Sequence, residues 1–123
     1  MAKFQPDGRH TVTPRIITPD PENLVRFLKD VFHAQGEYRA GRPAEIRIGD
    51  SVIMVSDGDG VRDLMPAFLY VYVADADATY KRAIAAKATS LEEPANMPYG
   101  DRRAMVRDSW GNTWQIATHK HDP

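Results

Sequence analysis

The residues with the greatest capacity for chemistry are concentrated in one stretch, residues 99–119. This stretch reads YGDRRAMVRDSWGNTWQIATH and holds both tryptophans of the chain, three arginines, two aspartates and a histidine. Carboxylate, guanidinium and imidazole groups close together can transfer protons or bind a polar ligand. The same residue types also gather at hairpin turns, where aspartate and asparagine hydrogen-bond the backbone. The stretch is therefore either a catalytic cluster or a hairpin with a polar turn.

The turn interpretation accounts for most of these residues. The segment from Asp108 to Asn112 (DSWGN) has a capping aspartate and, at Gly111 and Asn112, two residues that tolerate a positive φ. It predicts two strands, at about 102–107 and 112–118. We expect three residues before the hairpin to form a structural or rim hydrogen-bond network rather than a catalytic group: Tyr99, Asp101 and Arg102.

Composition excludes several function classes. A chain of 123 residues fits one domain, and 42% hydrophobic with 27% charged residues is ordinary for a globular protein. A net charge of −1 gives no basic face for nucleic acid or for an acidic membrane surface. The absence of cysteine excludes disulfides and thiolate metal sites. No apolar run is long enough for a membrane helix, and MAKFQPDGRH is no signal peptide, so we expect a cytoplasmic protein.

The elements that must position these residues follow from hydrophobic period and turn signals. Asp20 and Pro21 predict the start of an amphipathic helix, and Asp75 the start of a second one. The first half is predicted as an arm at 1–9, a strand at 11–18, a helix at 21–33, a hairpin within 44–57 that turns at Gly49-Asp50, and a loop at 56–66. The second half is predicted as a strand at 68–73, the second helix, a short strand near Leu91, a loop at 94–98 and the final hairpin.

The order of elements repeats, which predicts an internal duplication. Both halves read β-α-β-β-β. Residues 13–20 correspond to residues 68–75, and residues 50–56 correspond to residues 111–117. The predicted modules are about 10–57 and 66–119.

Four motifs resemble one known family. They are HTVTP at 10–14, IGDSVIMV at 48–55, YGDR at 99–102 and RDSWGNTWQIATH at 107–119. They are similar to the PhnB-like branch of the vicinal oxygen chelate superfamily, which holds glyoxalase I, the bleomycin- and fosfomycin-resistance proteins and the extradiol dioxygenases. The resemblance implies an α+β fold in which two βαβββ modules form a cup-shaped mixed sheet within one domain, residues 10–120. It also implies a bacterial protein and a homodimer. In a departure from the pattern, Pro43 replaces a histidine that often precedes the Ala-Glu pair.

The metal site of the family is predicted to be lost. Metal-using members place four ligands on four strands, and the resemblance puts these positions at Thr13, Met54, Phe68 and Gln115. Phenylalanine and methionine offer a hard cation nothing useful, threonine little, and glutamine one neutral oxygen. We therefore expect no metal and no cofactor. His119 and His121, with His10, would suit an accidental terminal metal site; the alternative, which we favour, is solvated histidines.

Strand alternation divides the predicted sheet into two faces. The face expected to pack beneath the helices is apolar and carries Ile16, Ile53, Val55, Leu69, Val71, Val73, Trp114 and Ile116. The other face mixes aromatic, polar and small side chains. Besides the predicted ligand-binding residues named next, it includes Ile17, Ser56 and Ala117. The predicted ligand-binding residues are Arg15, Glu45, Met54, Phe68, Tyr70, Tyr72 and Gln115. The tyrosines could instead be half-buried core, and Arg15 could merely pair with Glu45 or an aspartate.

Aromatic walls with an arginine and an amide are typical of a pocket for a small organic molecule. The function predicted from the sequence is metal-independent binding of an aromatic or hydrophobic ligand in the cup. The alternative is a glyoxalase-like lyase or isomerase, with or without a divalent metal held by atypical ligands. No catalytic residue is assigned, because Glu45 lacks an evident electrophile to act on.

Overall fold

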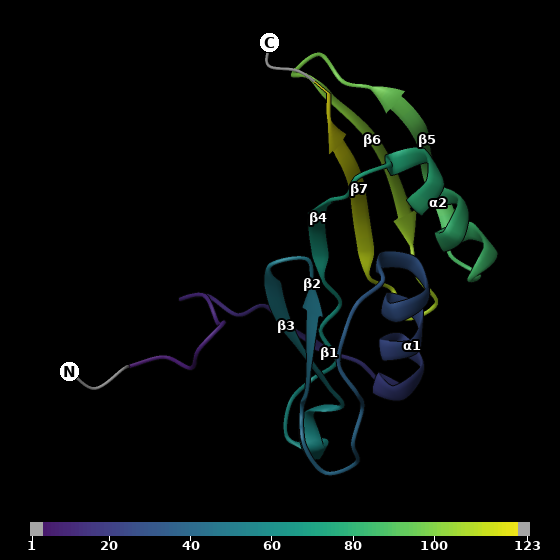
Figure 1. Ribbon diagram of the computed structural model, residues 1–123. Coiled ribbons are helices and arrows are strands. Elements are labelled where there is room, and N and C mark those ends of the chain that lie inside the picture. The colour runs from purple at the N-terminus through teal and green to yellow at the C-terminus, as the bar shows by residue number, and fades with distance from the viewer. Residues whose placement is uncertain (1–3, 121–123) are drawn as a thin grey trace. The chain divides into compact units, whose positions relative to one another are not determined.

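The computed structural model describes residues 4–120, which divide into two compact units. The first unit extends to Met65 and the second begins at Pro66 (Figure 1). Asp30–Phe32, the last turn of the first helix, belongs to the second unit. Each unit has its own sheet, and one helix begins in each unit. This arrangement confirms the predicted α+β class.

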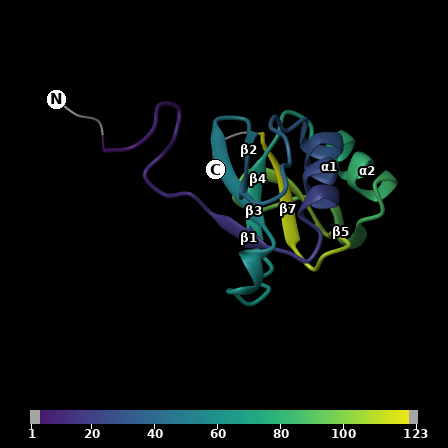
Figure 2. The same cartoon turned by 90° about the horizontal axis from the view of Figure 1, so that it is seen from below.

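The first unit contains a three-stranded sheet in the order β1-β3-β2. Its strands are β1 (Arg15–Ile17), β2 (Ala44–Ile48) and β3 (Ser51–Ser56). β1 runs parallel to β3, whereas β2 and β3 form the predicted antiparallel hairpin. Gly49 occupies the turn with a φ of 59°, a conformation that favours glycine. The residues that precede β1 lead away from it as an arm (Figure 2).

Helix α1 (Pro21–Phe32) begins where the sequence predicts. The Asp20 side chain accepts a hydrogen bond from the backbone N–H of Asn23 at 3.2 Å, which satisfies an otherwise unpaired donor of the first turn. The apolar stripe at helical spacing is buried: Leu24, Val25, Phe27, Leu28 and Val31. The helix ends one residue earlier than predicted, since His33 adopts a left-handed conformation with a φ of 56°.

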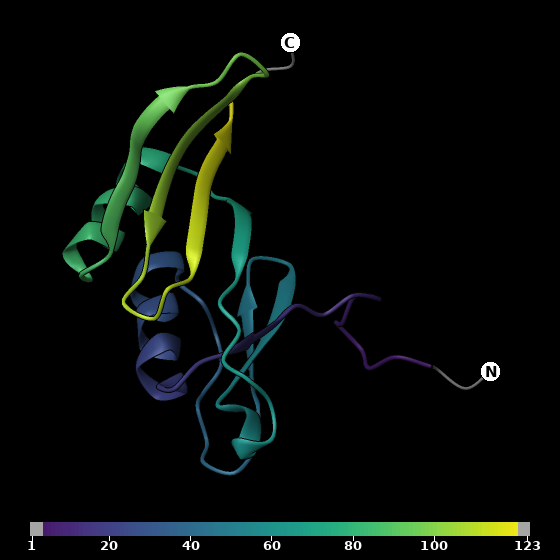
Figure 3. The ribbon, with the colours of Figure 1, turned by 180° about the vertical axis from the view of Figure 1, so that it is seen from behind.

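The second unit contains a four-stranded sheet in the order β4-β7-β6-β5. Its elements are β4 (Phe68–Tyr72), α2 (Ala76–Ala85), β5 (Thr89–Asn96), β6 (Asp101–Arg107) and β7 (Thr113–His119). Helix α2, capped by Asp75, packs against β5, β6 and β7 on one face of the sheet (Figure 1). When the second unit is seen from behind, the strands of its sheet lie nearer the viewer than α2 does (Figure 3).

Strand register supports the equivalence of the two halves. Arg15 pairs with Met54 between β1 and β3, and Tyr70 pairs with Gln115 between β4 and β7. The predicted repeat equates Arg15 with Tyr70 and Met54 with Gln115, so the equivalent residues are paired in the same way. In the first unit, the strand that should follow the helix is reduced to an isolated bridge between Gln35 and Arg47.

Two predicted strands differ in extent from the observed ones. The strand predicted at 11–18 is limited to Arg15–Ile17. Conversely, the strand near Leu91 extends to Asn96 and includes Pro94, which was predicted to lie in a loop. β5 is the edge strand of its sheet, and its register shifts between Glu92 and Ala95, so the missing N–H of proline is tolerated.

The predicted apolar face is largely confirmed. Five of its residues are buried: Ile16, Ile53, Val55, Trp114 and Ile116. The three on or next to edge strand β4 are half-buried: Leu69, Val71 and Val73. Strand register places Ile17, Ser56 and Ala117 on the mixed face, as predicted, but all three are buried there. Ile17 bridges to Met65, so the chain after β3 covers it, and Ala117 is a small residue whose register partners are Tyr72 and Arg103.

Asp108 forms the centre of the turn between β6 and β7. Its carboxylate accepts hydrogen bonds from the backbone N–H groups of Trp110 and Asn112, the Asn112 side-chain amide and the Trp114 indole, each at 2.9 Å. Asp108, Asn112 and Trp114 are all buried, and the Trp114 ring packs on Phe32 with a centroid separation of 5.3 Å. This part of residues 99–119 therefore has a structural role.

An ion pair joins α2 to β6 on the helix-covered side. Arg102 donates from Nε and Nη2 to the two carboxylate oxygens of Asp77, each at 3.1 Å. The hydrogen bond from Arg102 lowers the pKa of Asp77. A folded-state pKa below the unfolded value stabilises the protein at neutral pH, and that contribution is lost as the pH falls through the folded value.

We expect Asp77→Asn to lower the free energy of unfolding at pH 7 by at most about 1 kcal/mol, because both side chains are partly exposed. The difference from the wild type should shrink as the pH falls below about 4, the unfolded-state pKa of aspartate, and vanish once the pH is below the lowered folded-state pKa. Urea unfolding at neutral pH and through this acidic range measures this. The exposed Asp63 offers the control Asp63→Asn, and an equal, pH-dependent loss there would contradict the assignment.

Within residues 4–120, no helix is both long enough and apolar enough to cross a membrane.

Candidate functional site

The sheet face opposite α2, called here the open face, gathers polar and aromatic side chains. By strand alternation and register, it carries Phe68, Tyr70, Tyr72, Glu92, Asp101, Arg103, Met105, Gln115 and His119. These residues come from all four strands of the second sheet. The helix-covered side, in contrast, is formed mainly by buried apolar residues such as Val106 and Trp114.

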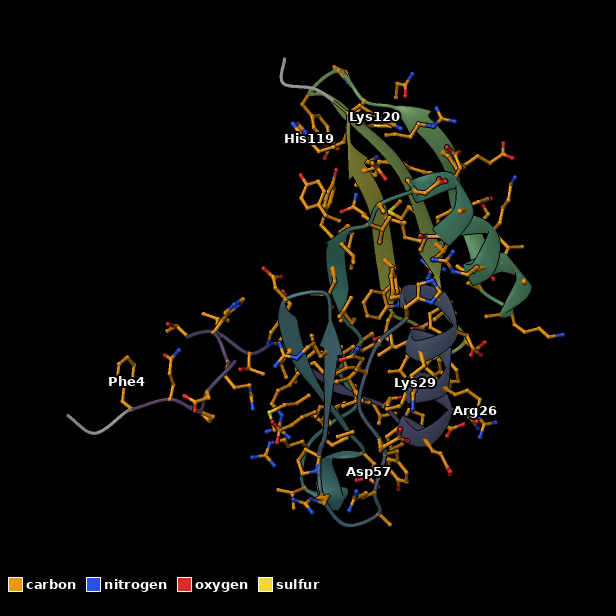
Figure 4. All side chains as sticks on the ribbon, viewed as in Figure 1. Phe4, Arg26, Lys29, Asp57, His119 and Lys120 are labelled. Atoms are coloured by element: carbon orange, nitrogen blue, oxygen red, sulfur yellow. The ribbon has the colours of Figure 1, made fainter. Side chains whose placement is uncertain are left out.

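Asp101, at the start of β6, is the centre of a hydrogen-bond network on this face. Although its side chain is only 2% exposed, it accepts hydrogen bonds from the hydroxyls of Tyr70 at 2.6 Å and Tyr72 at 3.0 Å. Its second oxygen lies 2.9 Å from Nδ1 of His119, which stands at the end of β7 (Figure 4). One buried carboxylate thus connects β4, β6 and β7.

These contacts change the acidity of the groups involved. Hydrogen bonds from Tyr70 and then from His119 lower the pKa of Asp101, so its carboxylate is ionised at neutral pH. Burial, and then the hydrogen bond to Asp101, raises the pKa of Tyr70. The hydrogen bond to Asp101 raises the pKa of Tyr72. Both tyrosines therefore keep their protons across the physiological range.

The direction of the hydrogen bonds follows from the two ends of the network. Arg103 can only donate, and it donates to the Tyr99 hydroxyl at 3.2 Å. The ionised Asp101 can only accept, so the single proton of Tyr70 points to it. Tyr99 must then donate its own proton to the Tyr70 oxygen, 3.1 Å away. Arg103 is also paired with Glu92 at 2.7 Å.

Strand β4 presents three aromatic side chains to solvent on the open face. Phe68 is 68% exposed, Tyr70 37% and Tyr72 62%. The rings of the two tyrosines are 5.3 Å apart between centroids and tilted by 59°. Gln115 is the register partner of Tyr70, so its amide belongs to the same row. Exposed aromatic side chains concentrated on one strand mark a binding surface better than scattered ones do.

In the first unit, the predicted residues Arg15, Met54 and Glu45 form one cross-strand row, because Met54 pairs with both of the others. Arg15 donates to Ser56 Oγ at 3.4 Å and does not pair with Glu45. Glu45 instead forms an ion pair with Arg9 of the arm. A hollow of about 330 Å³ lies beside this pair, lined by Pro6, Asp7, Arg9, Gln35, Gly36, Glu45, Arg47 and Val52.

The donor set at the family's metal positions does not fit a divalent cation. Met54 and Phe68 supply a thioether and a phenyl ring, and Gln115 one amide oxygen. Thr13 Oγ1 accepts a hydrogen bond from the Arg9 guanidinium at 3.0 Å, which places a positive charge where a cation would need a ligand. Among residues 4–120, no group of three or more histidine or carboxylate side chains could hold a metal.

The sequence missed the partner of one residue. His119 is exposed at the end of β7, as predicted, but its imidazole also hydrogen-bonds Asp101, which the sequence analysis did not expect. The turn at 108–112 could have revealed this, since it fixes the hairpin register in which Asp101 lies opposite His119. Tyr99 and Asp101 do belong to a hydrogen-bond network, as predicted. His121 lies outside the described residues, and His10 is exposed.

The profile of the Glyoxalase/Bleomycin resistance protein/Dioxygenase superfamily matches residues 9–116 of the chain. The protein belongs to this superfamily. The match includes both units and all the strands of their sheets except the last residues of β7. The predicted vicinal oxygen chelate superfamily is thereby confirmed.

Solved structures and another protein sequence are similar to the chain. The crystal structure of TioX from Micromonospora sp. ML1 aligns with a TM-score of 0.75 and 25% identity, over 89% of this chain and 98% of TioX. A glyoxalase/bleomycin resistance protein/dioxygenase family enzyme from Burkholderia phytofirmans PsJN aligns with a TM-score of 0.71 and 22% identity, over 85% and 94% of the two chains. Protein Rv0887c of Mycobacterium tuberculosis is 25% identical, over 85% of this chain and 72% of its own length.

Proposed function

We propose that the protein binds a small organic molecule with an aromatic or hydrophobic body, and that it does so without a metal ion. The observation that carries this proposal is the row of exposed aromatic side chains at Phe68, Tyr70 and Tyr72, held beside polar groups on the open face. Aromatic walls with a few fixed polar groups are typical of ligand sites. Membership of a superfamily that includes bleomycin-resistance proteins supports a binding role.

A thermal-shift screen of aromatic compounds and antibiotics tests the proposal. A ligand at about 100 times its Kd adds about 2.7 kcal/mol to the free energy of unfolding, so at least one compound should raise the Tm clearly. Phe68→Ala removes a side chain that is 68% exposed, so we expect the variant to fold. We expect its Kd for the ligand to rise at least tenfold and the thermal shift to become correspondingly smaller. A screen without any shift would contradict binding.

Two controls sharpen this test. Val61→Ala also removes an exposed apolar side chain, but from the first unit, and should leave the shift unchanged. EDTA should leave it unchanged as well, since the binding residues supply no metal site. Stoichiometric zinc, nickel, manganese or iron in the purified protein, lost on Gln115→Ala, would contradict metal independence.

We also propose Arg15, Glu45 and Met54 as ligand-binding residues of the first unit, considered by itself, and a homodimer as the functional form. The homodimer is supported by the apolar side chains of Phe4, labelled in Figure 4, and of Val12. Their side chains are 91% and 76% exposed. Light scattering on the purified protein should give twice the mass of the chain. The double variant Phe4→Ser, Val12→Ser should shift the mass toward that of one chain.

One observation favours the second candidate function, a glyoxalase-like lyase or isomerase. Asp101 holds Nδ1 of His119 at 2.9 Å, and a carboxylate that orients an imidazole is a common arrangement in proton transfer. Turnover of methylglyoxal with glutathione, followed with and without added nickel or zinc, tests this alternative. Loss of turnover in His119→Ala, with ligand binding retained, would favour it over binding alone.

A further inference from the structure

The polar network of the open face contains one carboxylate, Asp101, that has no arginine or lysine among its hydrogen-bond partners. Glu92 neutralises Arg103 through an ion pair at 2.7 Å. Asp101, however, is buried among two tyrosyl hydroxyls and His119, none of which carries a positive charge while the imidazole is neutral. While the imidazole is neutral, a ligand on this face meets the negative charge of Asp101, which no arginine or lysine among these contacts offsets.

The orientation of the hydroxyl groups extends this charge toward the surface. Tyr70 and Tyr72 both direct their protons inward to Asp101. The Tyr72 oxygen therefore directs its lone pairs away from Asp101, whereas the Tyr70 oxygen also accepts a hydrogen bond from Tyr99. A phenol that donates to a carboxylate also gains electron density in its ring. The two exposed ring faces thus attract positive charge more strongly than those of solvated tyrosines.

The geometry of the rings suits a cation of moderate size. Their centroids are 5.3 Å apart, and the interplanar angle of 59° leaves the ring faces inclined to each other rather than stacked. A cation within about 6 Å of a ring centroid is attracted by its quadrupole, and paired aromatic faces bind alkylated ammonium groups in this way. Phe68, two positions earlier on the same face of β4, adds apolar surface for the body of the ligand.

We infer that the open face binds an organic cation, an alkylated ammonium group on an aromatic or apolar body, over the rings of Tyr70 and Tyr72 with Asp101 as the counter-charge. This inference rests on the proposed function and specifies the chemical class of its ligand. Neutral molecules of the same shape bind more weakly, and anions are repelled.

A pair of compounds that differ only in charge tests the inference. (3-Hydroxyphenyl)trimethylammonium and 3-tert-butylphenol have the same shape and the same hydroxyl, but only the first is a cation. Titration of the full chain, followed by the NMR signals of the tyrosine rings and by calorimetry, should give a Kd at least ten times lower for the cation. The signals of Tyr70 and Tyr72 should shift, while that of Tyr80, which hydrogen-bonds Ser90 from α2, should not.

Three variants assign the preference to the named groups. Tyr72→Leu removes a ring that is 62% exposed, so it should fold normally and lose most of the preference. Asp101→Asn removes the charge and should bring the two Kd values within about threefold of each other. Tyr80→Phe, the control, should keep the tenfold ratio. If Asp101→Asn does not fold, Tyr72→Leu still decides the outcome.

The results separate this inference from the proposed function. Equal affinity for the two compounds, or a preference for the neutral one, overturns the cation site and leaves small-molecule binding in place. A cation preference that survives Tyr72→Leu also overturns it. If neither compound binds while the aromatic screen yields a neutral ligand, the inference fails alone; if neither binds and the screen is empty, both fail.

Discussion

Asp108→Ala should lower the free energy of unfolding by about 3–4 kcal/mol. The Asp108 carboxylate accepts four hydrogen bonds at 2.9 Å, and the Trp114 indole and the Asn112 amide that donate two of them are fully buried. Removing the acceptor leaves these donors without water and without a partner, which costs more than the bonds themselves contribute. Urea unfolding followed by tryptophan fluorescence measures the loss.

The other hairpin offers a matched control. Asp50 occupies the turn between β2 and β3, but it is exposed, and it accepts a hydrogen bond from the neighbouring Ser51 at 3.2 Å. Asp50→Ala should change the free energy of unfolding by no more than about 0.5 kcal/mol. Equal losses at the two turns would show that a turn aspartate, rather than the buried network around Asp108, determines the effect.

Gly36→Ala should destabilise the first unit by about 3 kcal/mol or more. Gly36 has a φ of 130°, and a Cβ there would lie 2.5 Å from the carbonyl oxygen of Glu45. Backbone atoms cannot give way cheaply, so the bridge between Gln35 and Arg47 must open. That bridge holds two hydrogen bonds, of 2.9 and 2.8 Å. Chemical unfolding and amide hydrogen exchange at Arg47 both report its loss.

Gly41→Ala separates the steric effect from the conformational one. Gly41 also has a positive φ, of 85°, but nothing lies within 4 Å of its Cβ position. Gly41→Ala should therefore lower the free energy of unfolding only by the strain of the backbone conformation, about 1–2 kcal/mol. A loss as large as that of Gly36→Ala would mean that the close approach to Glu45 contributes nothing.

Much of the fold could be predicted because its signals are local. Asp20 and Asp75 cap helices through their own side chains, and Gly49 forms a turn because glycine adopts a positive φ readily. The isolated bridge at Gln35 had no such signal. It depends on Gly36 passing close to the backbone of β2, which is a contact between distant segments.

The candidate site was predicted residue by residue, and a network was predicted near Asp101, but the hydrogen bonds from Tyr70, Tyr72 and His119 to Asp101 were not. Strand alternation placed Tyr70, Tyr72 and Gln115 on one face, and the register of β4 and β7 agrees. Alternation says nothing about how far a side chain reaches across the sheet to a strand that is not its neighbour. The contact of Asp101 with Tyr72 depends on that reach, because β7 lies between their strands. Whether these residues bind a ligand stays a prediction.

A chain of hydrogen bonds runs from Arg103 through Tyr99 and Tyr70 to Asp101, and its fixed direction has a consequence for ligand affinity. Side chains that a ligand must immobilise each subtract about 0.5–1.5 kcal/mol from binding. The hydroxyls of Tyr70 and Tyr72 already point to Asp101, and Tyr70 is also held by Tyr99. These rings lose little rotational freedom when a molecule settles on them. The open face is preorganised, so even a small ligand with few contacts can be retained there.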